Sequence, residues 1–181
     1  MTIPEDFDSL HTISPGKHFY QFYKHTDGFL SVMLPYFEAG LEKGEACLWL
    51  VSQKHNINFD QIVTEIFERH HPLPEQFQIF SAEDWYLDGT GSFSEEKSLR
   101  NAERFLTDIF AKGFKCLRAA GDAGAIPRKD WPLVRTYEEK AGAIIKSNPV
   151  IALCAYPILE CTPSQTKQVL ELLDDVLVGK W

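Results

Sequence analysis

The chain has 181 residues, of which 44% are apolar and 24% are charged, and its formal net charge is −8. Such a chain suits one globular domain that buries about 70% of its unfolded surface. The negative charge disfavours independent binding to DNA or RNA, because an acidic surface repels their phosphates. No apolar run approaches the roughly 20 residues that a membrane-spanning helix needs, so we expect no membrane span.

The amino-terminal residues and the cysteines indicate the compartment. The chain begins with an acidic segment that precedes no apolar stretch, which predicts no signal peptide and a cytoplasmic location. Its four cysteines are scattered and form no CxxC pair; they are Cys47, Cys116, Cys154 and Cys161. In a cytoplasmic chain we expect them to be reduced and mostly buried, and we expect no zinc site.

Strand and helix patterns alternate along the chain after an arm at residues 1–16. We expect, in chain order, a strand at Lys17–Tyr23, a helix at Phe29–Leu41, a strand at Ala46–Val51, a helix at Phe59–His70, a strand at Phe77–Phe80, a helix between Ser94 and Gly113, a strand at Lys115–Ala120, a helix at Asp130–Ser147, a strand at Val150–Tyr156 and a helix at Pro163–Leu177. Asn58, Ser94 and Thr162 are candidate helix caps, and a kink is expected near Pro35.

This alternation predicts a single α/β domain over residues 17–181. The expected architecture is a three-layer sandwich around a mainly parallel central sheet. The run Ala46–Val51 is apolar at every position, which is typical of a strand buried on both faces of such a sheet. The frame is therefore that of a nucleotide-binding α/β domain.

The turn after the first predicted strand, however, is not a phosphate loop. A phosphate loop needs glycines, whose N–H groups wrap the phosphates, followed by Lys-Ser or Lys-Thr. Residues 23–28 (YKHTDG) offer one lysine, one glycine and one carboxylate. The chain also has no GxSxG elbow, no GxGxxG fingerprint and no nucleophile–base spacing. We expect a sensing domain without catalytic activity, metal or cofactor, and residual ATPase activity is the alternative.

Ligands of open parallel sheets bind beyond the carboxyl ends of the strands. This rule selects five segments: residues 23–27, 52–55, 81–86, 118–124 and 156–160. They are rich in aromatic and ionisable side chains, which predicts a pocket where they converge. Arg118 interrupts an apolar strand and Asp122 follows at its end, so this pair is the first candidate to hold a polar ligand or, through Asp122, a metal. The alternative is that Arg118 pairs with a nearby carboxylate.

Other candidates lie on the first strand and among the aromatic residues. His18 and Tyr20 share one face of the strand while Tyr23 points to the other. A pocket histidine senses pH, binds a metal or orients a ligand, and the alternative for His18 is a structural role. A set of aromatic residues is expected to line an apolar cavity or, alternatively, only to fill the core: Trp85, Tyr86, Trp131, Tyr137 and Tyr156. Cys154 lies in a buried strand, where a thiol is expected to be inert.

Several segments occur in an order and at spacings that resemble a known family. They are residues 18–23 (HFYQFY), 35–45 (PYFEAGLEKGE), 47–51 (CLWLV), 83–86 (EDWY), 117–118 (LR) with Gly113 and Gly121, 130–131 (DW), 137–138 (YE) and 152–156 (ALCAY). Together they resemble the MEDS sensory domain, which is named for sensory modules of methanogen and methylotroph regulators, including the dichloromethane-responsive repressor. The resemblance covers roughly residues 16–178.

The resemblance implies a degenerate RecA-like or clock-ATPase-like fold without a phosphate loop. It implies sensing of small hydrocarbon derivatives for a histidine kinase or a transcription regulator. The chain has no room for either, so signalling through a partner protein is expected. Two departures concern the pocket: Tyr20 stands where the family often has cysteine, and residues 122–126 (DAGAI) lack the tryptophan that is common there.

Three hypotheses follow for the function. The first is a small-molecule sensor whose pocket lies at the carboxyl edge of the sheet, with Arg118 as polar anchor. Its expected ligand-binding residues are His18, Tyr23, Trp85, Arg118, Asp122, Trp131 and Tyr156. The second is a degenerate nucleotide-binding protein with weak or no ATPase activity. The third is a structural module that forms a homodimer.

Overall fold

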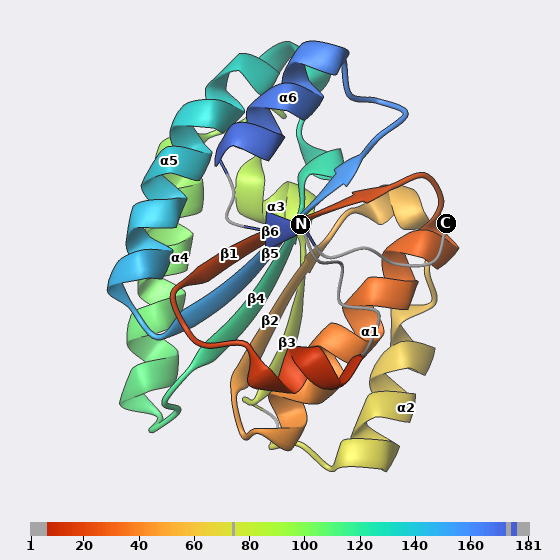
Figure 1. Cartoon of the computed structure of the whole chain (residues 1–181), viewed down its shortest axis with the longest axis vertical. Helices are drawn as coiled ribbons and strands as arrows, with labels where there is room; N and C mark the ends of the chain where they lie inside the picture. Colours follow the sequence, from red (N-terminus) through yellow and green to blue (C-terminus); the bar gives the residue numbers. More distant parts are fainter. Residues whose placement is uncertain (1–6, 74, 173–174, 177–181) are drawn as a thin grey trace.

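The computed structural model describes residues 7–73, 75–172 and 175–176. They build a six-stranded sheet in the order β3-β2-β4-β5-β1-β6, and every neighbouring pair is parallel (Figure 1). The strands are β1 (Lys17–Tyr23), β2 (Ala46–Val51), β3 (Phe77–Ser81), β4 (Leu117–Asp122), β5 (Val150–Pro157) and β6 (Asp175–Val176). The expected α/β class with a parallel central sheet is confirmed.

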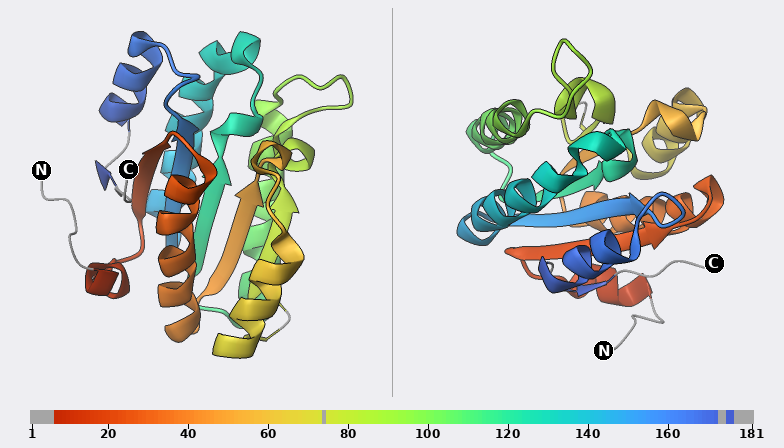
Figure 2. Two further views of the ribbon diagram at one scale, coloured as in Figure 1. Left: turned by 90° about the vertical axis from the view of Figure 1, so that its right-hand side faces the viewer. Right: turned by 90° about the horizontal axis from the view of Figure 1, so that it is seen from above.

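Helices cover both faces of the sheet, which gives the expected three layers (Figure 2). They are α1 (Thr26–Glu42), α2 (Phe59–His70), α3 (Ala82–Tyr86), α4 (Glu95–Ala111), α5 (Trp131–Ser147) and α6 (Pro163–Leu172). One face packs on α1 and α2, and the other packs on α3, α4 and α5. Because every strand runs in the same direction, all the carboxyl ends meet at one edge of the sheet.

Strand β2 shows why the sheet is buried on both sides. Its odd-numbered residues, such as Cys47 and Trp49, belong to the core cluster under α1 and α2. Its even-numbered residues, such as Leu48 and Leu50, belong to the cluster under α3, α4 and α5. Side chains alternate between the faces of a strand, so both sets are apolar only where both faces are covered.

Two expectations near the amino terminus are refined by the structure. Residues 7–12 of the expected arm form a 3-10 helix, η1 (Phe7–Thr12), and Leu10 joins the core beside α1. Helix α1 continues through Pro35 to Glu42. Proline removes one backbone hydrogen bond at a cost of roughly 3 kcal/mol. The burial of Met33, Tyr36 and Phe37 around it outweighs this cost, because each such side chain contributes about 1.5–3 kcal/mol.

Two expected elements have different bounds in the structure. Strand β4 covers Leu117–Asp122 rather than residues 115–120, because pairing with β2 and β5 on both sides extends it through Gly121. The last helix ends at Leu172, and Asp175–Val176 form β6 instead of continuing the expected helix. These residues pair with the open edge of β1, where unpaired backbone groups favour a strand over a local helical pattern. Leu177 lies outside the described residues.

The three candidate helix caps are confirmed. The hydroxyls of Ser94 and Thr162 and the amide oxygen of Asn58 each accept a hydrogen bond from a backbone N–H in the first turn of the following helix, so all three are caps. Short 3-10 helices follow the strands as η2 (Gln53–His55), η3 (Ala123–Ala125) and η4 (Arg128–Asp130). In the part of the chain that the structure describes, no helix is both long and apolar enough to cross a membrane.

Candidate ligand-binding sites

The Asp122 carboxylate is the centre of a polar network at the carboxyl edge. It is fully buried at the end of β4. Its Oδ1 accepts hydrogen bonds from the Tyr23 hydroxyl and the Gly124 N–H, each at 2.8 Å. Its Oδ2 accepts from the Ser52 N–H at 3.2 Å and lies 3.0 Å from His55 Nε2. Four groups from three segments, residues 23–27, 52–55 and 118–124, therefore surround one carboxylate.

The groups that surround Asp122 are themselves held in place. The His55 ring stacks on Phe29, with ring centroids 4.2 Å apart and planes 14° from parallel. Its Nδ1 lies 3.2 Å from the Thr26 hydroxyl, so both ring nitrogens have a neighbour. Burial, and next the Asp122 charge, raises the pKa of Tyr23 far above its usual range. The Tyr23 hydroxyl therefore stays neutral and remains a hydrogen-bond donor to Asp122.

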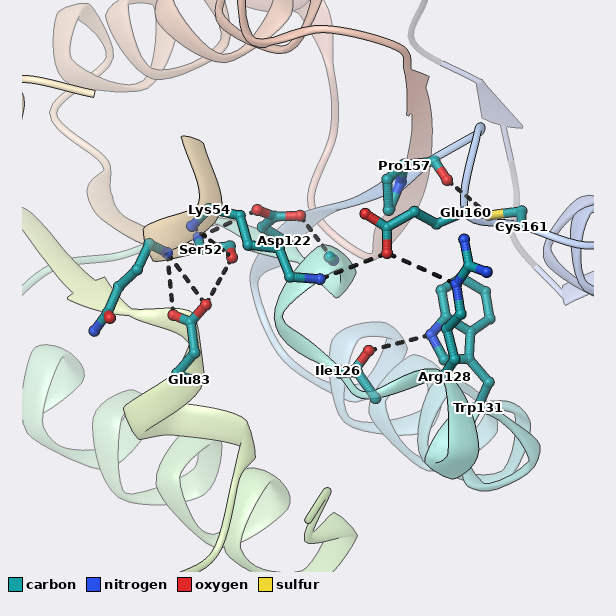
Figure 3. Close-up of polar contacts among 12 residues, drawn as sticks. Ser52, Lys54, Glu83, Asp122, Ile126, Arg128, Trp131, Pro157, Glu160 and Cys161 are labelled. Carbon is teal, nitrogen blue, oxygen red and sulfur yellow. Dashed lines mark hydrogen bonds and ion pairs between the residues drawn. The ribbon is translucent and has the colours of Figure 1, made fainter. Parts of the chain in front are cut away.

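Glu83 forms a second acceptor in the same network (Figure 3). It follows β3 in helix α3 and accepts a hydrogen bond from the Ser52 hydroxyl at 2.6 Å. It also accepts from the backbone N–H of Gln53 at 3.2 Å. Helix η2, which carries His55, is thus tied to the sheet from both sides, by Asp122 and by Glu83.

An open cleft of about 500 Å³ lies outside this network. Its walls are the turn Tyr23–Asp27, the end of η2 and the loop after β5. Lys54 Nζ lies 3.5 Å from a Glu160 carboxylate oxygen, and Arg128 Nε lies 4.0 Å from the same oxygen (Figure 3). The cleft therefore carries both signs of charge at its rim.

A second, smaller space lies on the other face of the sheet. This inner cavity has a volume of about 90 Å³ between the strands and helices α3, α4 and α5. Apolar residues that include Leu48, Leu50, Trp85, Ala102, Leu106 and Ala141 line most of it. His18 of β1 and Cys154 of β5 border it, as do the hydroxyl-bearing Tyr86 and Tyr137. An apolar cavity with a few polar groups at one wall is typical of small-molecule sites.

The hydroxyl of Tyr86 approaches the inner cavity across Gly121. A Cβ atom at position 121 would lie 2.2 Å from this hydroxyl oxygen, so only glycine leaves room for it. Burial raises the pKa of Tyr86 and of Tyr137, which also lines the cavity, well above the usual range. Both hydroxyls are therefore neutral at physiological pH.

The structure divides six of the seven predicted binding residues into three groups. Tyr23 and Asp122 meet at the carboxyl edge, as expected from the strand ends. His18 and Trp85 line the inner cavity. Trp131 and Tyr156 contact each other next to that cavity, with ring centroids 6.0 Å apart, without lining it. Of the five aromatic residues expected to form a cavity, Trp85, Tyr86 and Tyr137 do so. That these residues bind a ligand stays a prediction.

Arg118 stands apart from the other predicted site residues. It lies four residues before Asp122, which places it about 13 Å from the carboxyl edge along the strand. Its Nε donates to Glu45 Oε2 at 2.6 Å, its guanidinium lies 5.0 Å from the centre of the Tyr36 ring, and an NH2 group donates to the Leu10 carbonyl. Arg118 therefore has the carboxylate partner of the alternative hypothesis, and it does not reach the cleft.

Sequence reasoning missed three polar residues that the structure brings to these sites. His55 and Glu83 lie in segments that the strand-end rule had selected, and their position after a strand was the available signal. Glu138 lies in the middle of α5, and in the sequence it looks like one of the charged residues on the solvent-exposed side of that helix. Its burial, with 5% of the side chain exposed, depends on how α5 packs on β1 and β5.

The comparisons with known proteins add a family. The family described as "MEDS: MEthanogen/methylotroph, DcmR Sensory domain" matches residues 17–172. No curated protein matches the chain significantly. Among solved structures, the chain is similar to "Crystal structure of the RadB recombinase", with 14% sequence identity and a TM-score of 0.45. The similarity covers 84% of this chain and 66% of the RadB chain.

Proposed function

The chain belongs to the MEDS family of sensory domains, and on this premise we propose that it senses a small organic molecule without catalysing a reaction. The signal passes to a partner protein, a histidine kinase or a transcription regulator. The observation that carries the proposal is the inner cavity, which holds about 90 Å³ of mostly apolar space inside the domain.

The volume of the inner cavity limits the size of the ligand that can bind in it. Protein interiors are close-packed, and a void larger than a water molecule is unusual. An apolar cavity of about 150 Å³ binds benzene or xenon and stays free of water. A cavity of about 90 Å³ suits a smaller molecule, such as a one- or two-carbon halide, thiol or alcohol. Removing such a molecule from water provides the driving force.

The second candidate is residual nucleotide binding in the cleft at the carboxyl edge. The volume of the cleft and the presence of Lys24 and Lys54 on its walls favour it. Two observations speak against it. Glu160 pairs with Lys54, and four protein groups surround the Asp122 carboxylate, which leaves no free oxygen lone pair for Mg²⁺. Small-molecule sensing is therefore the better supported function.

Filling the inner cavity tests the proposal. Ala102 lines the cavity from α4, so Ala102→Leu places three more carbon atoms in it. Ala143 is exposed on α5, and Ala143→Leu is the matched control. We expect dichloromethane to raise the Tm of the unchanged chain and of Ala143→Leu, and to leave the Tm of Ala102→Leu unchanged. Native mass spectrometry reports whether the ligand is retained.

Other results would redirect the assignment. If dichloromethane, methanethiol and ethanol all leave the Tm unchanged, the sensing proposal is wrong. If they stabilise Ala102→Leu as well as the control, the ligand lies elsewhere. Stabilisation by ATP with Mg²⁺ alone would favour the nucleotide candidate.

A further inference from the structure

Three metal-ligating side chains meet at the polar wall of the inner cavity. His18 comes from β1, Cys154 from the neighbouring strand β5, and Glu138 from helix α5 above them. Ala152 is opposite His18 in the strand register, so Cys154 lies two residues further on the same face. His18 and Glu138 are 3% and 5% exposed. The three donor atoms lie within 4.8 Å of one another.

The distances within this cluster are those between the ligands of a tetrahedral metal ion. His18 Nε2 lies 3.3 Å from Cys154 Sγ and 3.4 Å from Glu138 Oε2. Cys154 Sγ lies 3.7 Å from the same carboxylate oxygen. With Zn–S near 2.3 Å and Zn–N and Zn–O near 2.1 Å, a tetrahedron has edges of about 3.4–3.6 Å. The observed triangle has this size without any rearrangement of the side chains.

The surroundings orient the carboxylate and balance the charge. The Tyr156 hydroxyl donates to Glu138 Oε1 at 2.6 Å, which leaves Oε2 directed at His18 and Cys154. Hydrogen bonds of this kind fix metal ligands in other proteins. A thiolate and a carboxylate together neutralise a divalent cation, so the filled site adds no net charge to a buried region.

We propose that His18, Glu138 and Cys154 bind one divalent transition-metal ion of the zinc type, whose fourth coordination position faces the inner cavity. Imidazole, thiolate and carboxylate are all zinc ligands, and three protein ligands with an open position are typical of zinc sites that bind a further molecule. His18 and Cys154 both border the cavity, so a small molecule inside it lies beside the ion. A ligand with a sulfur or oxygen donor then binds the metal directly.

The metal site itself is independent of the sensing role, and only the assignment of the fourth position rests on the proposed function. The positions of the three residues also show why the sequence analysis expected no zinc site. Positions 18, 138 and 154 are too far apart in the sequence to form any metal motif. Only the pairing of β1 with β5 and the packing of α5 bring them together.

Cobalt titration of the full chain tests the site. After treatment with a chelator, the protein is titrated with CoCl₂ while the thiolate-to-cobalt absorption band is recorded. We expect one Co²⁺ per chain with this band, its loss in Cys154→Ser, and at least tenfold weaker binding in His18→Gln. Cys116→Ser changes a thiol outside the cluster and is expected to keep the band. Tyr156→Phe removes the hydroxyl that contacts Glu138 and Cys154 but no metal ligand, and it is expected to weaken binding about tenfold.

Two further measurements separate this proposal from the sensing proposal. Ala102→Leu fills the cavity without changing a ligand, so it is expected to keep the cobalt band. Methanethiol is expected to change the cobalt spectrum of the unchanged chain and not that of Ala102→Leu. If the unchanged chain shows the cobalt band but no organic molecule raises its Tm, the metal site is supported and the sensing role is contradicted. The absence of a thiolate band, or an equal band in folded Cys154→Ser, would overturn the metal site.

Discussion

The two faces of the sheet differ in what surrounds their buried ionisable side chains. Under α1, the Arg118 guanidinium is enclosed by Glu45, the Tyr36 ring and the Leu10 carbonyl. Under α5, the buried Glu138 and His18 sit beside a cavity. The Arg118 charge is paired with a protein carboxylate and borders neither the cleft nor the inner cavity, so we assign it a structural role. A polar cluster that faces space is available to a ligand, so the α5 face is where we place binding.

The largest expected loss of stability concerns Arg118, on the face of the sheet that packs on α1. Arg118→Ala removes the buried partner of Glu45 and leaves that buried carboxylate with only the partly exposed Lys43 as a charged partner. We expect a loss of about 3–5 kcal/mol in the free energy of unfolding, measured by urea titration. Arg135 forms an exposed pair with Glu139 on α5, and Arg135→Ala is expected to cost at most about 0.5 kcal/mol. Equal losses in the two variants would contradict the structural role of Arg118.

A matched pair of carboxylates compares the two faces directly. Glu45→Gln leaves the buried Arg118 charge without a carboxylate, and we expect a loss of about 3 kcal/mol. Glu138→Gln retains an oxygen that accepts the hydrogen bond from Tyr156, and it leaves no buried arginine without a carboxylate partner. The expected loss in the free energy of unfolding is therefore about 1 kcal/mol. Both values come from urea unfolding after treatment with a chelator. If Glu138→Gln lowers the free energy of unfolding as much as Glu45→Gln does, the proposed difference between the two faces is wrong.

The carboxyl edge gives an intermediate effect. A Cβ at Gly124 would lie 2.6 Å from the Tyr23 hydroxyl and 2.9 Å from Asp122 Oδ1. Gly124→Ala therefore forces these groups apart, and we expect a loss of about 2 kcal/mol in thermal or urea unfolding. Nothing lies within 4 Å of a Cβ at Gly89, so Gly89→Ala is expected to change stability by less than about 0.5 kcal/mol. If Gly124→Ala costs no more than this control, the network around Asp122 is looser than its distances indicate.

The smallest expected effect is a loss of stability in alkali. Burial, and next the Glu45 charge, raises the pKa of Cys116 from 9.0 to about 11. Burial, and next the Glu160 charge, raises the pKa of Cys161 to about 11. The unfolded chain releases these protons near pH 9 and the folded chain near pH 11. Their contribution is therefore complete below pH 9 and is lost between pH 9 and 11.

Unfolding experiments at several pH values check this loss. Both thiols are only partly buried, so solvent screens their interactions and we expect a change below about 1 kcal/mol. In the double variant Cys116→Ser/Cys161→Ser, the loss between pH 9 and 11 is expected to be smaller, and the remainder comes from Cys47 and Cys154, whose pKa values burial also raises. An unchanged pH profile in the double variant would exclude the two thiols as the cause.

Part of the candidate site followed from general rules of parallel sheets. The carboxyl-end rule placed Tyr23, Asp122 and the segment around His55 at one edge, where the structure brings them together. The same rule also grouped Arg118 with Asp122, because it selects residues near the end of a strand without considering how far apart they lie along the strand. Four residues of a strand span about 13 Å, so the two side chains lie on the same face of β4 without meeting.

The sequence by itself determined the alternation of strands and helices, the parallel α/β class and the polar character of the strand ends. These properties depend on local periodicity and on the chemistry of short segments, which each stretch of residues carries without its neighbours. The tertiary structure alone decided the strand order, the pairing of Arg118 with Glu45 and the meeting of His18, Glu138 and Cys154. The partners in these contacts lie 73 or more residues apart along the chain, apart from Glu138 and Cys154, which come from a helix and a strand. Side chains from different elements become neighbours only when the elements pack, because no local pattern records which strand lies next to which.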